Sequence, residues 1–328
     1  MGSPHPLAPS PARGRGGGLI SGDTPGPGRV SLRPLRLTLR RQATLAGYLF
    51  LLPNIVGFLV FSSIPVLVTL GISTLDWDMI RTPTFVGIGN YAVLVTQDAV
   101  FRQVLGNTAF YVVGTVPAGI VLSLLLALAM NAQLRGITFF RAIFFVPVIT
   151  SAVAVAMVWR WLYNRDFGLI NLALHAVGLP AIPWLSSSAW AMPAIILMAI
   201  WKRVGYDMVI YLAGLQAIPP QLYEAAQIDG AGRWRRFWHI TLPLLTPTTF
   251  FISVISIIGS FQVFDLAFIL TSGGPGNATN TMVMYVYNQA FQFFHMGYAA
   301  AVAWVLFLII LAITLVQWRI QRRWVHYE

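Results

Sequence analysis

The sequence predicts an all-α, polytopic membrane protein with six transmembrane helices and a helix-turn-helix loop on the cytoplasmic side. Hydrophobic residues make up 57% of the chain, and Asp, Glu, Lys and Arg only 9%, far below the roughly 25% of soluble proteins. Six apolar runs each have about the 20 residues that a helix needs to cross the hydrocarbon core. The alternative, a very apolar soluble protein, would have almost no sequence left for a wet surface.

The N-terminal segment has a different composition from the rest of the chain. Residues 1–38 are rich in Gly, Pro, Ser and Arg and contain few large apolar groups, so they predict a disordered basic tail. Residues 39–328 are predicted to form the transmembrane domain. The arginines before the first apolar run are also typical of a signal peptide, but the run is too long for one, so we expect an uncleaved first helix.

The six predicted spans follow from the apolar runs between polar segments. In chain order they are Ala46–Ile72, Asn107–Met130, Phe139–Leu162, Trp190–Ala213, Pro247–Leu270 and Tyr298–Trp318.

The distribution of arginine predicts the orientation of these spans. With the N-terminus in the cytoplasm, 13 arginines flank the inner ends of spans, and four lie outside, at Arg81, Arg102, Arg160 and Arg165. This bias places both termini and residues 216–246 in the cytoplasm, and residues 73–106 outside. It also accounts for the net charge of +11 without a nucleic-acid partner.

The sequence lacks the motifs of the common enzyme sites. It has no cysteine, which excludes disulfides and cysteine-ligated metals, and no HExxH. Its single lysine, Lys202, does not follow a glycine-rich loop of the kind that binds ATP phosphates. The glycine-rich TSGGPGNAT, residues 271–279, has no basic residue nearby and predicts a turn or re-entrant segment. We therefore expect no catalytic residue, metal or cofactor, and no enzyme activity in this chain.

The most polar cluster lies between the fourth and fifth spans, in residues 219–246. Pro219 and Pro220 end one helix and begin another, whose first turn is predicted to contain Glu224. Gly230 and Gly232 should end this short helix, and WRRFWHI should form a second helix that stops before Pro243. The alternative is an interfacial loop anchored by its tryptophans.

The stretch EAAQIDGAGRWRRFWHITLP, residues 224–243, resembles the EAA loop of permease subunits of ATP-binding-cassette importers. The resemblance implies that the loop is a coupling helix that docks on a separate cytoplasmic ATPase. The positions that match the family pattern are Glu224, Ala225, Ala226, Asp229, Gly230, Ala231, Ile240, Leu242 and Pro243.

Other segments resemble the carbohydrate-uptake branch of that family, of the maltose and glycerol-phosphate type. They are LLPNIVGFLVFSSIPVL, FVGIGNY, GLQAIPPQLYEAA and FQVFDLAFILTSGGPGNAT. The resemblance covers about residues 43–325. It implies a bacterial-type inner membrane and an external solute-binding protein as a partner. It also implies two ATP-binding subunits, a second and different permease, and a sugar, polyol or glycerol phosphoester as solute.

Polar residues within the fourth and fifth spans predict the substrate pathway. Lys202 and Asp265 lie 16 and 18 residues from the cytoplasmic ends of their spans, which places both about 24–27 Å up at 1.5 Å per residue. Aromatic and hydrogen-bonding side chains suit a sugar. The predicted pathway residues are Lys202, Phe261, Gln262, Phe264 and Asp265.

Two alternatives remain open from the sequence. Arg203 and Asp207 are spaced i, i+4 and would pair on one helix, while Lys202 would snorkel toward the membrane surface. An ion-coupled secondary transporter is the alternative function. It would need intramembrane carboxylates and an inverted repeat, but only Asp207 and Asp265 qualify and no repeat is visible.

Overall fold

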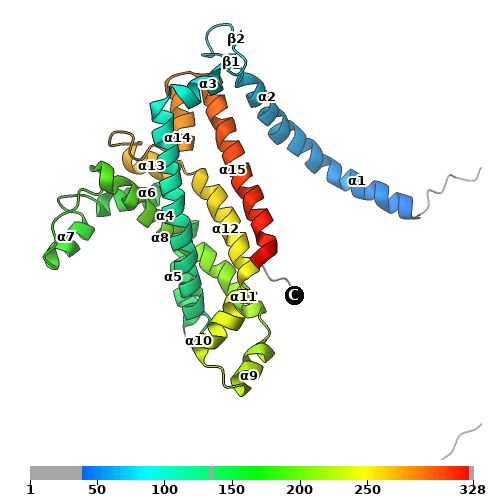
Figure 1. Ribbon diagram of the computed structural model, residues 1–328, viewed down its shortest axis with the longest axis vertical. Coiled ribbons are helices and arrows are strands. Elements are labelled where there is room, and N and C mark those ends of the chain that lie inside the picture. The colour runs from blue at the N-terminus through cyan, green and yellow to red at the C-terminus, as the bar shows by residue number, and fades with distance from the viewer. Residues whose placement is uncertain (1–38, 133–135, 325–328) are drawn as a thin grey trace, which may run out of the picture. The chain divides into compact units, whose positions relative to one another are not determined.

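The computed structural model describes residues 39–132 and 136–324 (Figure 1). The predicted tail, residues 1–38, lies outside this range. The elements are α1 Leu39–Phe58, η1 Leu59–Ser63, α2 Ile64–Ile72, β1 Leu75–Asp76, β2 Thr84–Phe85, α3 Gly89–Thr96, α4 Ala99–Met130, α5 Ile137–Ile149, α6 Ala152–Leu162, α7 Leu169–Ala176, α8 Ser188–Ala217, α9 Pro220–Ile228, α10 Arg233–Arg236, η2 Phe237–Thr241, α11 Leu242–Leu244, α12 Thr246–Phe261, α13 Asp265–Thr271, α14 Met282–Tyr287, η3 Asn288–Gln292 and α15 Met296–Trp324.

The chain divides into two compact units, and the boundary between them in the sequence lies between Phe58 and Leu59. The first unit contributes α1, a helix of 20 residues with Pro53 inside it. All other elements belong to the second unit, whose strands β1 and β2 form a short antiparallel pair with Leu75 opposite Phe85. The predicted all-α class is confirmed, since this pair is the only sheet in the described part of the chain.

Several helices have the length and composition of membrane spans. Three stretches are each long and apolar enough to cross a membrane: Ala43–Ile72, Ala99–Met130 and Met296–Gln321. Two bent helix pairs are long and apolar enough only when each pair is taken as one span: α5 with α6, and Arg233–Leu244 with α12. Helix α8 has 30 residues, more than the 20 or so required to span the hydrocarbon core, but contains Lys202, Arg203 and Asp207.

Two predicted spans are not single helices. Phe139–Leu162 is broken because Thr150 and Ser151 have extended backbone, with ψ of 141° and 132°, and α5 and α6 meet at 99°. Pro247–Leu270 is broken because α12 ends at Phe261 and α13 begins only at Asp265. Hydropathy averaged over a span does not reveal such breaks, since each involves only two or three residues between apolar segments.

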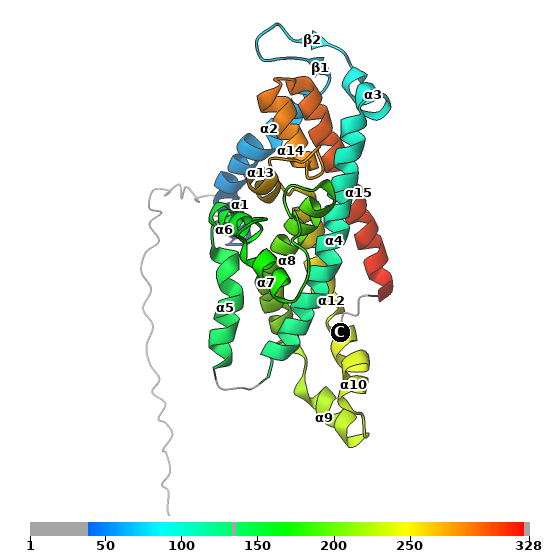
Figure 2. The same cartoon turned by 90° about the vertical axis from the view of Figure 1, so that its left-hand side faces the viewer.

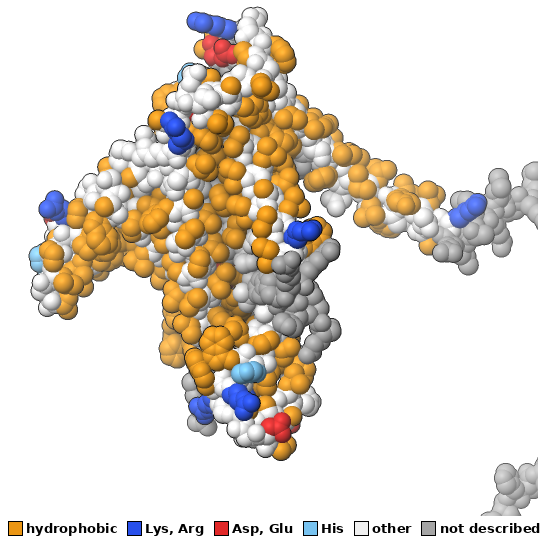
Figure 3. Space-filling view, viewed as in Figure 1, with side chains coloured by type: hydrophobic (Ala, Val, Ile, Leu, Met, Phe, Trp, Pro, Cys, Tyr) orange, Lys and Arg blue, Asp and Glu red, His pale blue; other side chains and the backbone are white. Residues whose placement is uncertain are grey.

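Helix α4 packs along α8, and α12 packs on both (Figures 1 and 2). Two of the buried clusters separate along these helices. One lies toward α14 and α15 and includes Val104, Phe101 and Val302, and the other lies toward α9 and includes Tyr211 and Leu245. Between these clusters, α4, α8 and α12 carry polar residues. On the face seen in Figure 3, hydrophobic side chains cover most of the helices of the second unit, as expected of a surface in contact with lipid.

The segment FVGIGNY anchors the connection after α2. The Asn90 side-chain amide donates to the carbonyl oxygens of Ser73 and Leu75, at 2.9 Å each. The hydroxyls of Tyr91 and Ser73 are hydrogen-bonded at 2.7 Å. A Cβ added at Gly297 would overlap the Leu75 carbonyl oxygen, so this glycine allows α15 to approach the same turn. The motif therefore fixes the ends of α2, α3 and α15 together.

Asp98 joins three helices at the same end of the bundle. Its Oδ1 accepts a hydrogen bond from Phe101 N at 2.8 Å and caps α4. Its Oδ2 accepts from the hydroxyls of Tyr285 of α14, at 2.5 Å, and Tyr298 of α15. Burial alone would raise the pKa of Asp98, but these hydrogen bonds outweigh it and hold that pKa below the ordinary 3.8.

We expect Asp98→Asn to lower the thermal unfolding midpoint of the purified protein, because hydrogen bonds to a charged group contribute about 1.5–3 kcal/mol. Since the folded-state pKa is lowered, the stabilisation is present above the unfolded-state pKa and is lost as the pH falls through the folded-state value. The wild-type midpoint should therefore fall more steeply than the mutant's below about pH 4. Asp166→Asn, at an exposed carboxylate, is the control. Parallel curves for wild type and Asp98→Asn would contradict the assignment.

Candidate functional site

A cavity of about 440 Å³ lies among α4, α5, α8, α12 and α13. Its polar lining comes from two sources, the charged residues and Tyr206 of α8, and the hydroxyl, amide and carboxylate groups of α4 and of the segment from α12 to α13. The lining residues with polar side chains are Tyr111, Thr115, Lys202, Arg203, Tyr206, Asp207, Ser256, Ser260, Gln262 and Asp265. The structure therefore brings together three of the predicted pathway residues, Lys202, Gln262 and Asp265.

Lys202 is bound at the break between α5 and α6. Its Nζ donates to the carbonyl oxygens of Pro147, at 3.3 Å, and Thr150, at 3.2 Å. A Cβ at Gly205 would overlap the Phe144 carbonyl oxygen, so this glycine allows α8 to approach α5 closely. The ammonium group of Lys202 therefore satisfies carbonyls at the bend, and the alternative that it snorkels toward the membrane surface stays a prediction. Lys202 thus donates hydrogen bonds to the backbone at the helix break and also lines the cavity.

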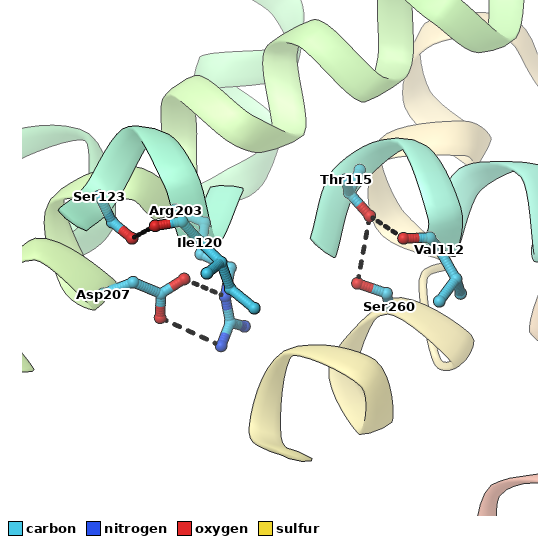
Figure 4. A network of polar contacts seen from close by, with 7 residues as sticks. All are labelled: Val112, Thr115, Ile120, Ser123, Arg203, Asp207 and Ser260. Atoms are coloured by element: carbon cyan, nitrogen blue, oxygen red, sulfur yellow. Dashed lines mark hydrogen bonds and ion pairs between the residues drawn. The ribbon is translucent and has the colours of Figure 1, made fainter. Parts of the chain in front are cut away.

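Arg203 and Asp207 form the i, i+4 ion pair that their spacing allowed. Arg203 Nε lies 3.1 Å from Asp207 Oδ2 (Figure 4). The two partners differ in burial, since the side chain of Asp207 is 2% exposed and that of Arg203 is 37% exposed. The guanidinium also lies 5.8 Å from the centre of the Tyr206 ring. The pair therefore places a buried carboxylate behind a guanidinium that reaches the cavity.

Hydroxyl groups complete the wall opposite α8. The hydroxyls of Thr115 on α4 and Ser260 on α12 lie 3.4 Å apart (Figure 4). Thr115 and Tyr111 are not among the pathway residues predicted from the sequence. Isolated polar groups within the apolar run of α4 were the available signal, but their spacing alone does not show which face they occupy.

Gln262 and Asp265 reach the cavity because α12 ends before them. Residues 262–264 are not helical, and the Val263 carbonyl released there accepts a hydrogen bond from the Thr281 hydroxyl at 2.8 Å. The side chains of Gln262 and Asp265 are exposed to the cavity. Asp265 Oδ1 accepts from Leu266 N at 2.9 Å, and neither Asp265 oxygen has an ion-pair partner in residues 39–132 or 136–324.

The two predicted phenylalanines do not line this cavity. Phe261 is 6% exposed and packs in the cluster with Phe101 and Val302. Phe264 stacks on Phe268, with ring centres 5.1 Å apart. The reason is the helix break, because it turns Gln262 and Asp265 toward α8 while the aromatic rings pack on neighbouring elements.

The predicted helix-turn-helix lies at the opposite end of the second unit from β1 and β2 (Figures 1 and 2). Pro219 precedes α9, and Pro220 is its first residue, as expected from their fixed φ. Glu224 is not in the first turn, because a helix that starts at Pro220 has Glu224 at its fifth position. The predicted interaction of Glu224 with the helix dipole is therefore wrong, and its carboxylate is instead exposed on the second turn.

Gly230 ends α9 in a Schellman motif. The N–H of Ala231 donates to the Ala226 carbonyl at 2.8 Å, and the N–H of Gly230 to the Gln227 carbonyl at 3.1 Å. Gly230 has φ of +77°, in the left-handed region that favours glycine. No atom lies within 4 Å of the position that a Cβ would occupy at Gly230. A side chain there would therefore strain the backbone but would cause no steric clash.

The second helix of the loop does not stop before Pro243. α10 continues through the π-helix η2 into α11, which ends at Leu244. Pro243 is compatible with this continuation because it lies in the first turn of α11, where a residue without an N–H removes no hydrogen bond within α11. Ile240 packs with Tyr223 against the cluster that contains Tyr211. The hydroxyls of Tyr223 and Thr241 are hydrogen-bonded at 2.9 Å, which ties α9 to η2.

The nine residues of the EAA resemblance therefore fall into two groups. The first group is mostly exposed and consists of Glu224, Ala225, Ala226, Asp229, Gly230 and Ala231, of which Ala226 and Ala231 are half-buried. The second group is half-buried and consists of Ile240, Leu242 and Pro243. The first group forms a free surface, and the second supports the loop on the bundle.

Comparisons with known proteins agree with this architecture. Residues 119–326 match the family described as "Binding-protein-dependent transport system inner membrane component". The chain is 37% identical to a lactose transport system permease protein of Rhizobium radiobacter, over 86% of this chain and 96% of that protein. It is 35% identical to an sn-glycerol-3-phosphate transport system permease protein of Agrobacterium fabrum, over 85% of this chain and 96% of that protein.

A solved structure has a similar fold. It is a chain of a bacterial alginate ABC transporter in complex with an alginate pentasaccharide-bound periplasmic protein, with a TM-score of 0.77 and 28% identity. The match covers 88% of this chain and 98% of that chain.

The unequal burial of Arg203 and Asp207 predicts unequal effects of their removal. Arg203→Met leaves a buried carboxylate without its partner, and we expect a loss of stability approaching the 3–5 kcal/mol typical of a broken buried pair. Asp207→Leu leaves a guanidinium that reaches the cavity, so it should cost less. The double variant should recover part of the loss. Thermal unfolding of the purified protein checks the order, and an Arg203→Met midpoint equal to or above that of Asp207→Leu would contradict it.

Proposed function

Because the chain belongs to the binding-protein-dependent transport system inner membrane component family, we propose that it forms one half of the membrane pathway of an importer for a sugar, oligosaccharide or glycerol phosphoester. As a permease of this family, it is a multi-pass membrane subunit without enzyme activity, and ATP hydrolysis belongs to a separate subunit. Its partners include that ATPase and a solute-binding protein.

One observation supports this function most directly. The loop of residues 219–246 is the covalent connection between α8 and α12, and these two helices line the polar cavity. A force on the exposed surface of α9 is therefore transmitted to both helices. We propose that the ATPase docks on Glu224, Ala225, Ala226, Asp229, Gly230 and Ala231, and that the half-buried Ile240, Leu242 and Pro243 hold this surface on the bundle.

The cavity supports a hydroxyl-rich solute within the membrane and has no net preference for either sign of charge. Its four charged lining residues, Lys202, Arg203, Asp207 and Asp265, carry equal numbers of positive and negative charges. Hydroxyl and amide groups on the opposite wall offer hydrogen bonds to sugar hydroxyls. An ion-coupled transporter would also use intramembrane carboxylates, but of its two candidates Asp207 is paired with Arg203, which leaves Asp265 alone for that role.

The arrangement around this permease is part of the proposal. Residues 39–328 would form a single permease domain that pairs with a second, homologous permease, with two ATPase copies on the cytoplasmic side. Both termini would be cytoplasmic, as the arginine distribution predicts. Single cysteines at Thr84 and Arg233 should then react with an impermeant maleimide from opposite faces, and reaction of both from outside would contradict this orientation.

If Asp265 lines the solute route, Asp265→Asn should lower uptake several-fold while the basal ATPase rate and the amount of assembled protein stay unchanged. The structural reason is that the carboxylate forms no ion pair in the described part of the chain, and the Asn oxygen can still accept the hydrogen bond from Leu266 N, so the substitution mainly removes the charge presented to the cavity. Asp166→Asn is the matched control outside this cavity. Loss of the protein from the membrane would indicate a structural role for Asp265 instead.

Gly230→Asp should abolish uptake and weaken co-purification of the ATPase, while the binding protein still binds its solute. A residue with a Cβ at φ of +77° costs on the order of 1 kcal/mol and misdirects the docking surface. Gly232→Asp is the matched control, because Gly232 has φ of −65° and ψ of 168°, which other residues adopt readily. Normal transport and ATPase association in Gly230→Asp would leave the loop as an interfacial anchor only.

A further inference from the structure

A second cavity lies on the predicted outer side, separate from the membrane cavity. Its volume is about 370 Å³, within the roughly 300–1,000 Å³ of small-molecule sites. It is formed by the end of α6, the segment between α6 and α8, and the end of α13. The two cavities share no lining residue. The lining of this outer cavity includes Arg160, Tyr163, Asn164, Arg165, Trp184 and Ser186.

The outer cavity has an unbalanced positive charge. Arg160 and Arg165 line it, and no aspartate or glutamate does. Neither guanidinium forms an ion pair or a hydrogen bond with any residue in 39–132 or 136–324, and this includes the adjacent Asp166. Arg160 lies in the last turn of α6, where its charge complements the helix dipole, but Arg165 lies beyond the helix and has no such role. Two like charges at one concave surface favour an anion.

A buried asparagine makes this cavity rigid. Asn171 is 2% exposed, and its Nδ2 donates to the carbonyl oxygens of Asn164, Arg165 and Ile182, at 3.0–3.3 Å. Its Oδ1 accepts from the N–H of Ile182, at 3.0 Å, and from the indole N–H of Trp184, at 3.1 Å. One amide therefore fixes both the backbone of Arg165 and the ring of Trp184.

Tyr163 also holds the ring of Trp184 in place at the aromatic side of the outer cavity. The rings of Trp184 and Tyr163 lie 5.4 Å apart, and the Tyr163 hydroxyl donates to the Ala194 carbonyl of α8 at 2.8 Å. The cavity thus combines an anchored indole ring, two unpaired guanidinium groups, and the Ser186 hydroxyl, which has no hydrogen-bond partner in the described part of the chain. An apolar sugar face suits the indole, and a carboxylate suits the planar guanidinium fork.

We propose that this outer cavity binds an anionic sugar unit, a pyranose that carries a carboxylate. The proposal rests on the proposed function as a carbohydrate importer and adds the charge of the solute. The concave shape favours a small ligand over the convex surface of an acidic protein. Since the charges of the membrane cavity balance, we assign the selection for negative charge to the outer cavity and not to the membrane cavity.

The natural absence of cysteine allows a direct test of occupancy. Ser186→Cys places a single thiol in the outer cavity, and Ile80→Cys, at a side chain 84% exposed outside the cavity, is the control. In the complete transporter in nanodiscs, millimolar galacturonate should slow maleimide labelling at position 186 at least threefold. Galactose and acetate should have little effect, because each lacks one of the two recognised groups. Arg160→Gln with Arg165→Gln should remove the protection.

Four outcomes would overturn the proposal. They are equal protection by galactose, no protection by any probe, protection that persists in the double glutamine variant, and protection only by an acidic solute-binding protein. The assay measures occupancy without transport, so such a failure leaves the importer function untouched. Absence of uptake in the presence of normal protection would instead count against the importer function.

Discussion

Carbonyl groups released at helix breaks must find hydrogen-bond donors where water is scarce, and the second unit is organised around this constraint. Two of its predicted spans are broken, and each break has a specific donor. Lys202 of α8 donates to Pro147 and Thr150 at the end of α5, and Thr281 donates to Val263 after α12. Without these donors, each unpaired carbonyl would carry a desolvation penalty of about 1–3 kcal/mol. These donors therefore stabilise two helix breaks, because they satisfy carbonyl groups that would otherwise have no hydrogen-bond partner.

The breaks in turn create the polar cavity. The end of α12 at Phe261 turns Gln262 and Asp265 toward α8, whose charged residues lie on the opposite wall. The Arg203–Asp207 pair keeps a buried carboxylate neutralised while the guanidinium reaches the cavity. Irregular backbone and charges inside a membrane protein are tolerated where they line such a cavity, and both occur together here.

The cytoplasmic loop is rigid within itself and exposed on one side. The Schellman hydrogen bonds end α9 at Gly230, and the Tyr223–Thr241 hydrogen bond holds α9 on η2. Ile240 joins the loop to the buried cluster that contains Tyr211 of α8 and Ile252 of α12. A displacement of the exposed helix would thus reach the cavity through packed side chains as well as through the chain.

The sequence by itself determined the class of the protein, the apolar stretches that could cross a membrane, and the place of the loop. These depend on local properties: a run of about 20 apolar residues, two prolines in succession, and a glycine where the chain must take positive φ. It also determined the Arg203–Asp207 pair, since i, i+4 neighbours meet on any helix. The tertiary structure decided where two spans break, what Lys202 binds, and that Phe261 and Phe264 pack away from the cavity. Lys202 and Pro147 are 55 residues apart, and only the packing of α8 against α5 brings them within hydrogen-bonding distance.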